Sequence, residues 1–259
     1  MDITVSSPGS PGTSFTDNVK AQIVLLYDEL ANHDDFGSLS DFKNHLGTCG
    51  LNASYTRNIL PFLQYCGIVK YENVSPFVND NFFTNIGKAY VDILKSIQIA
   101  QKEPDCDEKT DILKSLDKIQ EIIYFQCLAI MMKTQECNYS KDFYDVLCFM
   151  KEFESIDSTE YLLIQYEREQ SEEDMLKRLG AYIGQYRDGT LNVNVRTKTK
   201  NADDGKAKSV NSFPYVSGNF SKAGVVYKYE NRFYLNKERI SEVECALREV
   251  DVLCQNSAK

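Results

Sequence analysis

Residues 52–90, which read NASYTRNILPFLQYCGIVKYENVSPFVNDNFFTNIGKAY, carry the pattern that decides the fold. A run with helical periodicity ends at Gly67, and the β-branched and aromatic segment IVKY follows it. A loop with Pro76 separates IVKY from NFFT, the expected partner strand, and Thr84 or Asn85 then caps a new helix. This order of helix, strand, strand and helix predicts the second half of a winged helix-turn-helix.

Two further helices are expected before this stretch. The first is expected to begin with Thr16 or Asp17 as its N-cap, and the second to cover residues 39–46. Together these segments predict one winged-helix unit over residues 16–105. Residues 1–15 are rich in Gly, Pro, Ser and Thr, and we expect them to form a flexible tail.

The helix of the opening stretch has an apolar side and a polar side. The apolar side is expected to pack inward and consists of Tyr55, Ile59, Phe62, Leu63 and Cys66. The opposite side consists of Ser54, Arg57, Pro61 and Gln64. Pro61 removes one backbone hydrogen bond, so a kink is expected near the middle of the helix.

A second copy of the pattern lies near the C-terminus, in FPYVSGNFSKAGVVYKYENRFYLNKERISEVECAL at residues 213–247. VVYKYEN matches IVKYEN, RFYLN matches NFFTN, and the two copies are about 157 residues apart. When Phe220 is aligned with Phe62, the segment from Phe220 to Gly224 is one residue shorter than the segment from Phe62 to Gly67. The shared order of elements indicates a repeated supersecondary unit. In the second helix Phe213, Val216, Phe220 and Ala223 are expected to face inward, and Tyr215, Gly218, Asn219 and Lys222 outward.

Both copies resemble winged helices, and their tandem arrangement resembles the DNA-recognition regions of some type II restriction endonucleases. In that family winged-helix modules read the target and a separate domain cuts. The resemblance implies a mainly α fold with small β-wings (α+β), made of two winged-helix units in tandem. The second unit is expected over residues 106–259, which include an apolar helix at 113–133 and a long insertion at about 153–208.

The composition is typical of a soluble globular protein, with 42% hydrophobic and 26% charged residues. No apolar run approaches the roughly 20 residues of a membrane span, and no secretory signal is evident, so we expect a cytoplasmic protein with no membrane partner. The eight Cys residues form no CxxC, and His33 and His45 are the only His residues. We therefore expect reduced thiols, no cofactor and no Cys/His zinc site, with His45 as a helix-end or surface residue.

No catalytic motif is recognised. A restriction-type nuclease would need paired acidic residues and a Lys on adjacent strands. The nearest match is Asp105, Asp107 and Lys109, but these residues lie in a linker without flanking strands and are interpreted as a solvated acidic turn. Cys127 and Cys148 lie on apolar helical faces and are interpreted as core residues. The sequence therefore predicts a protein that is not an enzyme.

The net charge of −9 is unevenly distributed, with −4 over residues 1–100, −9 over 101–180 and +4 over 181–259. A local basic face is what phosphates require, so the C-terminal copy is the better DNA candidate. The expected DNA-binding residues are Ser54, Arg57 and Gln64 in the first unit, Tyr215, Asn219 and Lys222 in the second, and Arg196, Lys198, Lys200, Lys206 and Lys208 in a basic loop.

The function predicted is double-stranded DNA binding, in a specificity or regulatory component of a restriction or mobile-element system. The alternative is an adaptor whose winged helices hold a protein partner, with the acidic middle third of the chain as the contact.

Overall fold

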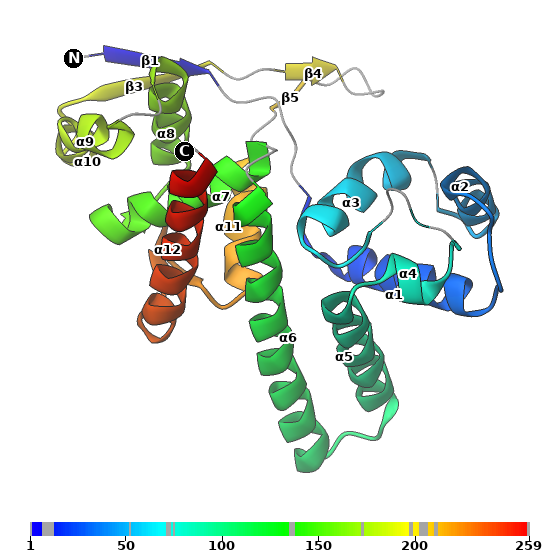
Figure 1. Cartoon of the computed structure of the whole chain (residues 1–259). Coiled ribbons are helices and arrows are strands. Elements are labelled where there is room, and N and C mark those ends of the chain that lie inside the picture. Colours follow the sequence, from blue (N-terminus) through cyan, green and yellow to red (C-terminus); the bar gives the residue numbers. More distant parts are fainter. Residues whose placement is uncertain are drawn as a thin grey trace. The chain divides into compact units, whose positions relative to one another are not determined.

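The computed structural model shows two compact units, which are described separately. The N-terminal unit is Thr13–Thr134, and the C-terminal unit combines Met1–Gly12 with Gln135–Lys259 (Figure 1). The structure describes residues 2–6, 13–51, 53–70, 74, 76–134, 138–171, 174–196, 199–201, 207–209 and 212–257. Within the described residues α-helices dominate and the strands are short, which confirms a mainly α fold with small β parts.

The N-terminal unit is helical. Its elements are α1 (Asp17–Ala31), α2 (Leu39–Thr48), α3 (Ala53–Tyr65), α4 (Asn79–Phe82), α5 (Asn85–Lys102) and α6 (Asp107–Thr134). The side chains of Thr16, Ser38 and Thr84 accept backbone hydrogen bonds at the starts of α1, α2 and α5. The structure thus selects Thr16 over Asp17, and Thr84 over Asn85, as N-caps.

The apolar helix α6 belongs to the N-terminal unit, not to the second unit as predicted. It packs along α5 and also contacts α3, and Figure 1 shows α5 and α6 side by side, joined by a short turn. Tyr124 of α6 is buried, and its hydroxyl accepts a 3.3 Å hydrogen bond from the backbone N–H of Phe15. The boundary between units therefore falls after Thr134 and not after residue 105.

The predicted flexible tail contains ordered structure. Residues 2–6 form strand β1 (Asp2–Ser6), in which Ile3 and Val5 are buried while Asp2 and Thr4 are exposed. This alternation suits a strand with one covered face. Phe15 is also buried, with its ring 4.3 Å from that of Tyr124. The remainder of the predicted tail up to Gly12 lies outside the described residues.

The C-terminal unit contains helices and three small sheets. Its further elements are α7 (Asn138–Phe153), β2 (Ser155–Ile156), α8 (Ser158–Gln170), α9 (Met175–Gly180), α10 (Ile183–Arg187), β3 (Asn192–Arg196), β4 (Thr199–Asn201), β5 (Ala207–Ser209), α11 (Phe213–Lys222), β6 (Val226–Tyr229), β7 (Arg232–Leu235), the 3-10 helix η1 (Lys237–Arg239) and α12 (Ile240–Ser257). β1 pairs in parallel with β3, β4 pairs with β5, and β2, β7 and β6 form an antiparallel sheet in that order.

The expected insertion at 153–208 is too long at its N-terminal end. β2 pairs with β7, and α8 buries Tyr161, Leu163 and Ile164, so both elements belong to the core of the unit. The inserted segment is therefore the part between α8 and α11, which contains α9, α10 and β3 to β5. None of the described helices is both long enough and apolar enough to cross a membrane.

Candidate nucleic-acid interface

In the N-terminal copy of the repeat, α3 ends in a Schellman motif. Gly67 has a φ of 68°, in the left-handed region that Gly adopts without strain. Its N–H donates to Gln64 O at 2.9 Å, and the next N–H, of Ile68, donates to Leu63 O at 2.9 Å. These are the two hydrogen bonds that define the motif.

The C-terminal copy ends α11 with the same motif. Gly224 has a φ of 66°, and its N–H donates to Ser221 O at 3.1 Å. The N–H of Val225 donates to Phe220 O at 2.9 Å. The helices of the two predicted copies therefore end in the same hydrogen-bonded motif.

The two copies also share the step from the second strand into the next helix. In the N-terminal copy Thr84 N donates to Ile68 O at 3.1 Å, and the Thr84 hydroxyl donates to Gly67 O at 2.5 Å. In the C-terminal copy Asn236 N donates to Val225 O at 2.8 Å, and the Asn236 amide donates to Gly224 O at 3.1 Å. Thr84 and Asn236 are therefore equivalent residues.

The shared hydrogen bonds correct the sequence alignment of the two helices. Leu63 and Phe220 both accept the last bond of the motif, so no residue is missing before the Gly in the second copy. Asn219 is consequently equivalent to Phe62, and both are buried, with Asn219 fully so. The prediction that Asn219 faces outward as a DNA contact is wrong, because the buried face of α11 is wider than its apolar stripe and includes Ser217 and Asn219.

The remaining predictions for α11 agree with the structure. The residues expected to face inward, Phe213, Val216, Phe220 and Ala223, are all buried. Tyr215 and Lys222 are exposed, and Gly218 between them is half-buried. They lie at helical spacing along one side of α11, a helix that contains no Asp or Glu.

The hairpin of β6 and β7 forms a narrow wing beside α11. Tyr227, Lys228 and Tyr229 of β6 are exposed, with Tyr229 at 61%. The Tyr227 ring stacks on that of Tyr234 with centroids 5.6 Å apart and an interplanar angle of 20°. The wing thus presents aromatic rings and an ammonium group to solvent.

The wing is attached to α8 by buried ion pairs, and we call Arg187 and Arg232 the arginine clamp. Glu160 is fully buried and, with Asp157, forms the capping box of α8. Arg232 of β7 donates to Glu160 Oε2 at 2.5 Å and to Asp157 Oδ2 at 3.0 Å, while Arg187 of α10 donates to Glu160 Oε1 at 2.7 Å. The two carboxylates raise the pKa of Arg232 against the opposing effect of desolvation. Both arginines bind the carboxylate of Glu160, which links the wing and α10 to the start of α8.

Other acidic residues of the middle third are paired in the same way. Asp142 of α7 accepts from Arg168 Nη2 at 2.5 Å, and Glu167 of α8 accepts from Arg178 Nε at 2.7 Å. The carboxylates of both pairs are buried. Asp142 and Glu167 are therefore bound to Arg side chains inside the unit and are not open to a partner.

The other expected DNA contacts are placed unevenly. Arg196 is exposed at the end of β3, and Gln64 of α3 is half-buried. Lys200 of β4 and Lys208 of β5 are directly opposite partners in the register of their hairpin. Ser54 and Arg57 lie on α3, but their side chains are outside the described set, as are residues Lys198 and Lys206.

Positive charge is concentrated where these elements lie in the sequence. From β3 to η1, residues 192–239, there are ten Lys and Arg against four Asp and Glu, a net charge of +6. The C-terminal unit as a whole, counted over residues 1–12 and 135–259, is at −4, with eighteen basic and twenty-two acidic residues. The basic segment is thus a local feature of α11, the wing and the preceding strands.

The residues considered for catalysis have structural environments. Asp105 is exposed and accepts from Lys109 Nζ at 2.8 Å, which lowers the pKa of Asp105 through that hydrogen bond. Desolvation raises the pKa of the Cys127 thiol to about 12, and that of Cys148 to about 12. Thiols of such high pKa are poor nucleophiles near neutral pH.

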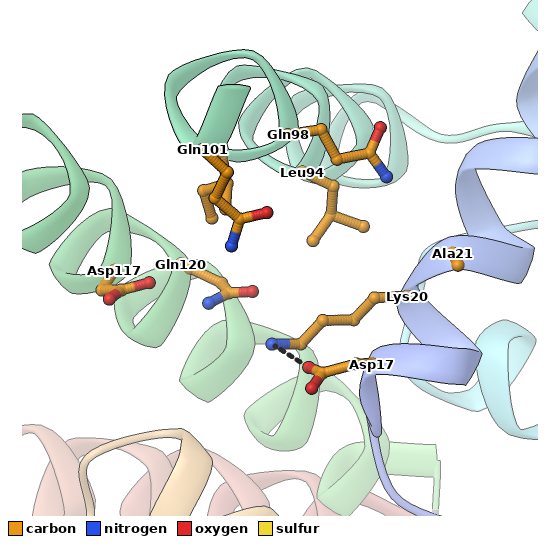
Figure 2. A pocket seen from close by; sticks show the side chains of 9 residues that line it. Asp17, Lys20, Ala21, Leu94, Gln98, Gln101, Asp117 and Gln120 are labelled. Carbon is orange, nitrogen blue, oxygen red and sulfur yellow. Dashed lines mark ion pairs between the residues drawn. The ribbon is translucent and has the colours of Figure 1, made fainter. Parts of the chain in front are cut away.

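A shallow pocket of about 260 Å³ lies between α1, α5 and α6 of the N-terminal unit. It is lined by Asp17, Lys20, Ala21, Leu94, Ile97, Gln98, Gln101, Asp117 and Gln120. Figure 2 shows the Lys20 side chain paired with Asp17 of the same helix, at 3.6 Å, with Gln120 nearby. The pocket offers an ammonium group, carboxylates and amides. It has no nucleophile beside a general base, so it suggests no catalytic chemistry.

No family model, curated protein sequence or solved structure matches this chain. Its function is therefore inferred from the geometry and charge of the described residues.

Proposed function

We propose that this chain is a non-catalytic, tandem winged-helix protein that binds double-stranded DNA, mainly through its C-terminal unit. The order α7, β2, α8, α11, β6, β7, with β7 central in the sheet, supports a winged-helix interpretation of that unit. In this interpretation α11 is the recognition helix, the helix that enters the major groove in helix-turn-helix proteins. The same interpretation makes α3 the equivalent helix of the N-terminal unit.

One observation carries the proposal: the acid-free helix α11 and its wing lie within the segment of net charge +6. Tyr215 and Lys222 face solvent on α11, and Lys228 does so on the wing. Ammonium groups in these places suit contact with the phosphates that flank a major groove. Arg232 is excluded as a contact because Glu160 and Asp157 occupy its guanidinium.

The N-terminal unit is proposed to be a scaffold or a site of protein contact. Residues 13–134 carry eleven basic and sixteen acidic residues, a net charge of −5, which disfavours binding to phosphates. A specificity or regulatory role in a restriction or mobile-element system would combine DNA recognition in one unit with a protein partner for the other.

The proposal is tested by the fluorescence anisotropy of a labelled random-sequence duplex mixed with the full chain at several salt concentrations. Wild type should bind at low salt and weaken steeply as salt rises, because bound Lys and Arg release counterions from DNA. The double variant Lys222→Glu and Lys228→Glu should bind at least about 30-fold more weakly, by the loss of two phosphate contacts and added repulsion.

The control is Lys177→Glu, the same substitution made once, and so half the charge change of the double variant, on an exposed residue of α9. It should change affinity less than about threefold, through net charge alone. If wild type shows no duplex binding at low salt, or if the control weakens binding as much as the double variant, the proposal fails.

The alternative, a protein-interaction adaptor, is favoured by the exposed rings of Tyr215, Tyr227 and Tyr229, since Tyr is enriched at interface hot spots. The burial of Asp142, Glu160 and Glu167 in Arg pairs counts against the acidic middle third as the contact surface. A chain that binds no duplex but loses a protein partner on Tyr229→Ala would support the adaptor.

A further inference from the structure

The two His residues of the chain, 12 positions apart in the sequence, lie side by side in the N-terminal unit. The ring centroids of His33 and His45 are 4.6 Å apart. One ring nitrogen of each and a carboxylate oxygen of Glu29 all lie within 4.8 Å of one another. Cys49 adds a thiol to this group, with its sulfur 3.6 Å from His45 Nε2.

These four residues come as two pairs with helical spacing. Glu29 lies in the last turn of α1 and His33 follows its C-cap Asn32, whereas His45 lies in the last turn of α2 and Cys49 is its C-cap. The distances among them show that the two helix ends bring these four groups to the same point. The sequence contains this pattern as ExxxH followed by HxxxC. The expectation of no Cys/His zinc site considered only CxxC and the number of His residues, and so missed it.

The spacing of the donor atoms is close to that of a tetrahedral zinc site. Zn–N bonds of about 2.0–2.1 Å and a Zn–S bond of about 2.3 Å place nitrogen and sulfur about 3.6 Å apart. His45 Nε2 and Cys49 Sγ are at 3.6 Å. His45 Nε2 and Glu29 Oε2 are at 2.6 Å, a hydrogen bond that must lengthen to about 3.3 Å for both atoms to bind one ion.

The imidazole of His33 is oriented as metal-binding imidazoles commonly are. Its Nδ1 lies 2.8 Å from the backbone oxygen of Glu29. Donation from Nδ1 to a carbonyl leaves the lone pair on Nε2, the nitrogen that would then bind the ion. The Phe36 ring packs against both imidazoles, with centroids 4.5 Å from His33 and 5.0 Å from His45.

The loop between α1 and α2 is fixed by other contacts. Asp35 accepts hydrogen bonds at 2.8 Å from the N–H groups of Gly37 and Phe77. The Phe36 ring also packs against that of Phe42, 5.0 Å away. The ligands therefore project from a supported corner, and exposures of 26% for the His45 side chain and 21% for that of Glu29 leave a path for an ion.

We propose that Glu29, His33, His45 and Cys49 form a tetrahedral zinc site that fastens the end of α1 to the end of α2. Two imidazoles, a thiolate and a carboxylate suit Zn²⁺, whereas Mg²⁺ and Ca²⁺ prefer oxygen ligands alone. Binding releases the thiol proton of Cys49, and any proton on the imidazole nitrogens that bind, to solvent. This site is independent of the DNA-binding proposal, because it lies in the N-terminal unit and needs no nucleic acid.

The test is calorimetric titration of Zn²⁺ into the full chain, stripped with a chelator and kept reduced by a phosphine. We expect one ion per chain. His45→Gln should raise the dissociation constant about 100-fold or more, since even outer-sphere changes cost 10–100-fold. His33→Gln, on the exposed loop, should do the same without risk to the core. Cys106→Ser, an exposed Cys of the same unit, is the control and should leave binding unchanged.

Co²⁺ gives an independent measurement of the ligands. The wild-type Co²⁺ complex should show the intense visible bands of tetrahedral coordination and a thiolate charge-transfer band in the near ultraviolet. Cys49→Ser should lose the charge-transfer band, with circular dichroism confirming that the variant is folded. Absence of Zn²⁺ binding, binding that survives His45→Gln and His33→Gln, or a wild-type Co²⁺ complex without the thiolate band would overturn the proposed site.

Discussion

The two copies of the repeat share their helix ends and differ in their wings. In the N-terminal copy the described residues of the two wing segments meet at one bridge, Val69 to Phe83. In the C-terminal copy β6 and β7 pair over four residues each, and β2 extends the sheet. The same helix-terminating motif thus supports a minimal wing in one unit and a true hairpin in the other.

The two units also hold their wings in different ways. The N-terminal wing is covered closely by a helix, because Gly87 at the start of α5 lies against the backbone of Ile68. The C-terminal wing is attached by charge, through Arg232 and Glu160. An exposed hairpin anchored in this way leaves its outer side open, which is the property that DNA contact requires.

The largest expected effect is that of Gly87→Ala. A Cβ there would lie 2.0 Å from Ile68 O, a backbone atom that cannot move without displacing the wing. We expect the free energy of unfolding of the N-terminal unit to fall by about 4 kcal/mol or more. Urea denaturation combined with hydrogen exchange by mass spectrometry would measure this loss of stability. Hydrogen exchange in residues 138–257 should be unchanged.

Gly47→Ala in α2 is the matched control, since a Cβ there meets no atom within 4 Å. It should leave the N-terminal unit as stable as wild type or more stable by up to about 1 kcal/mol. Equal destabilisation by both variants would contradict the close approach of α5 to Ile68.

Glu160→Gln should have the next largest effect, confined to the C-terminal unit. Removing the buried charge leaves the arginine clamp facing a neutral amide, and breaking a buried ion pair costs about 3 kcal/mol or more. Hydrogen exchange should accelerate in β2, β6 and β7. Glu244→Gln, at a half-exposed pair with Lys151, should cost less than about 0.5 kcal/mol. Unchanged exchange in the wing of Glu160→Gln would show that the clamp does not hold it.

The smallest expected effect is the loss of stability caused by Thr84→Ala and by Asn236→Ala. It should be equal in the two units if these residues are equivalent. Thr84→Ala and Asn236→Ala each remove one hydrogen bond to the helix-ending Gly and one cap of the following helix. Each should cost its own unit about 1–2 kcal/mol. Ser96→Ala, which removes only an exposed bond within α5, is the control. A loss at one position and none at the other would contradict their equivalence.

Local signals in the sequence predicted local structure well. The alternatives Thr16 or Asp17 and Thr84 or Asn85 located two helix starts to within one residue, and Gly67 and Gly224 identified two helix ends. These features depend on hydrogen bonds between residues close in the chain. The repeat was visible for the same reason, although its alignment needed the observed hydrogen bonds.

Features that join distant residues were not predicted. The pairing of β1 with β3 joins residues nearly 200 positions apart, and the apolar stripe of α6 does not indicate which neighbour covers it. Glu160 and Asp142 belong to the acidic middle third that was considered as a contact surface, because nothing local reveals that an Arg elsewhere in the chain pairs with each of them. The proximity of His33 and His45 could not be predicted, because it depends on the angle between α1 and α2.

Hydrogen exchange of the full chain, with and without a saturating random-sequence duplex at low salt, tests the central claim most directly. We expect the duplex to slow exchange in α11, β6 and β7, and to leave α3 and the Val69 to Phe83 wing unchanged. Exchange that is unaltered throughout, or protection found only in the N-terminal copy, would contradict DNA binding by the C-terminal unit.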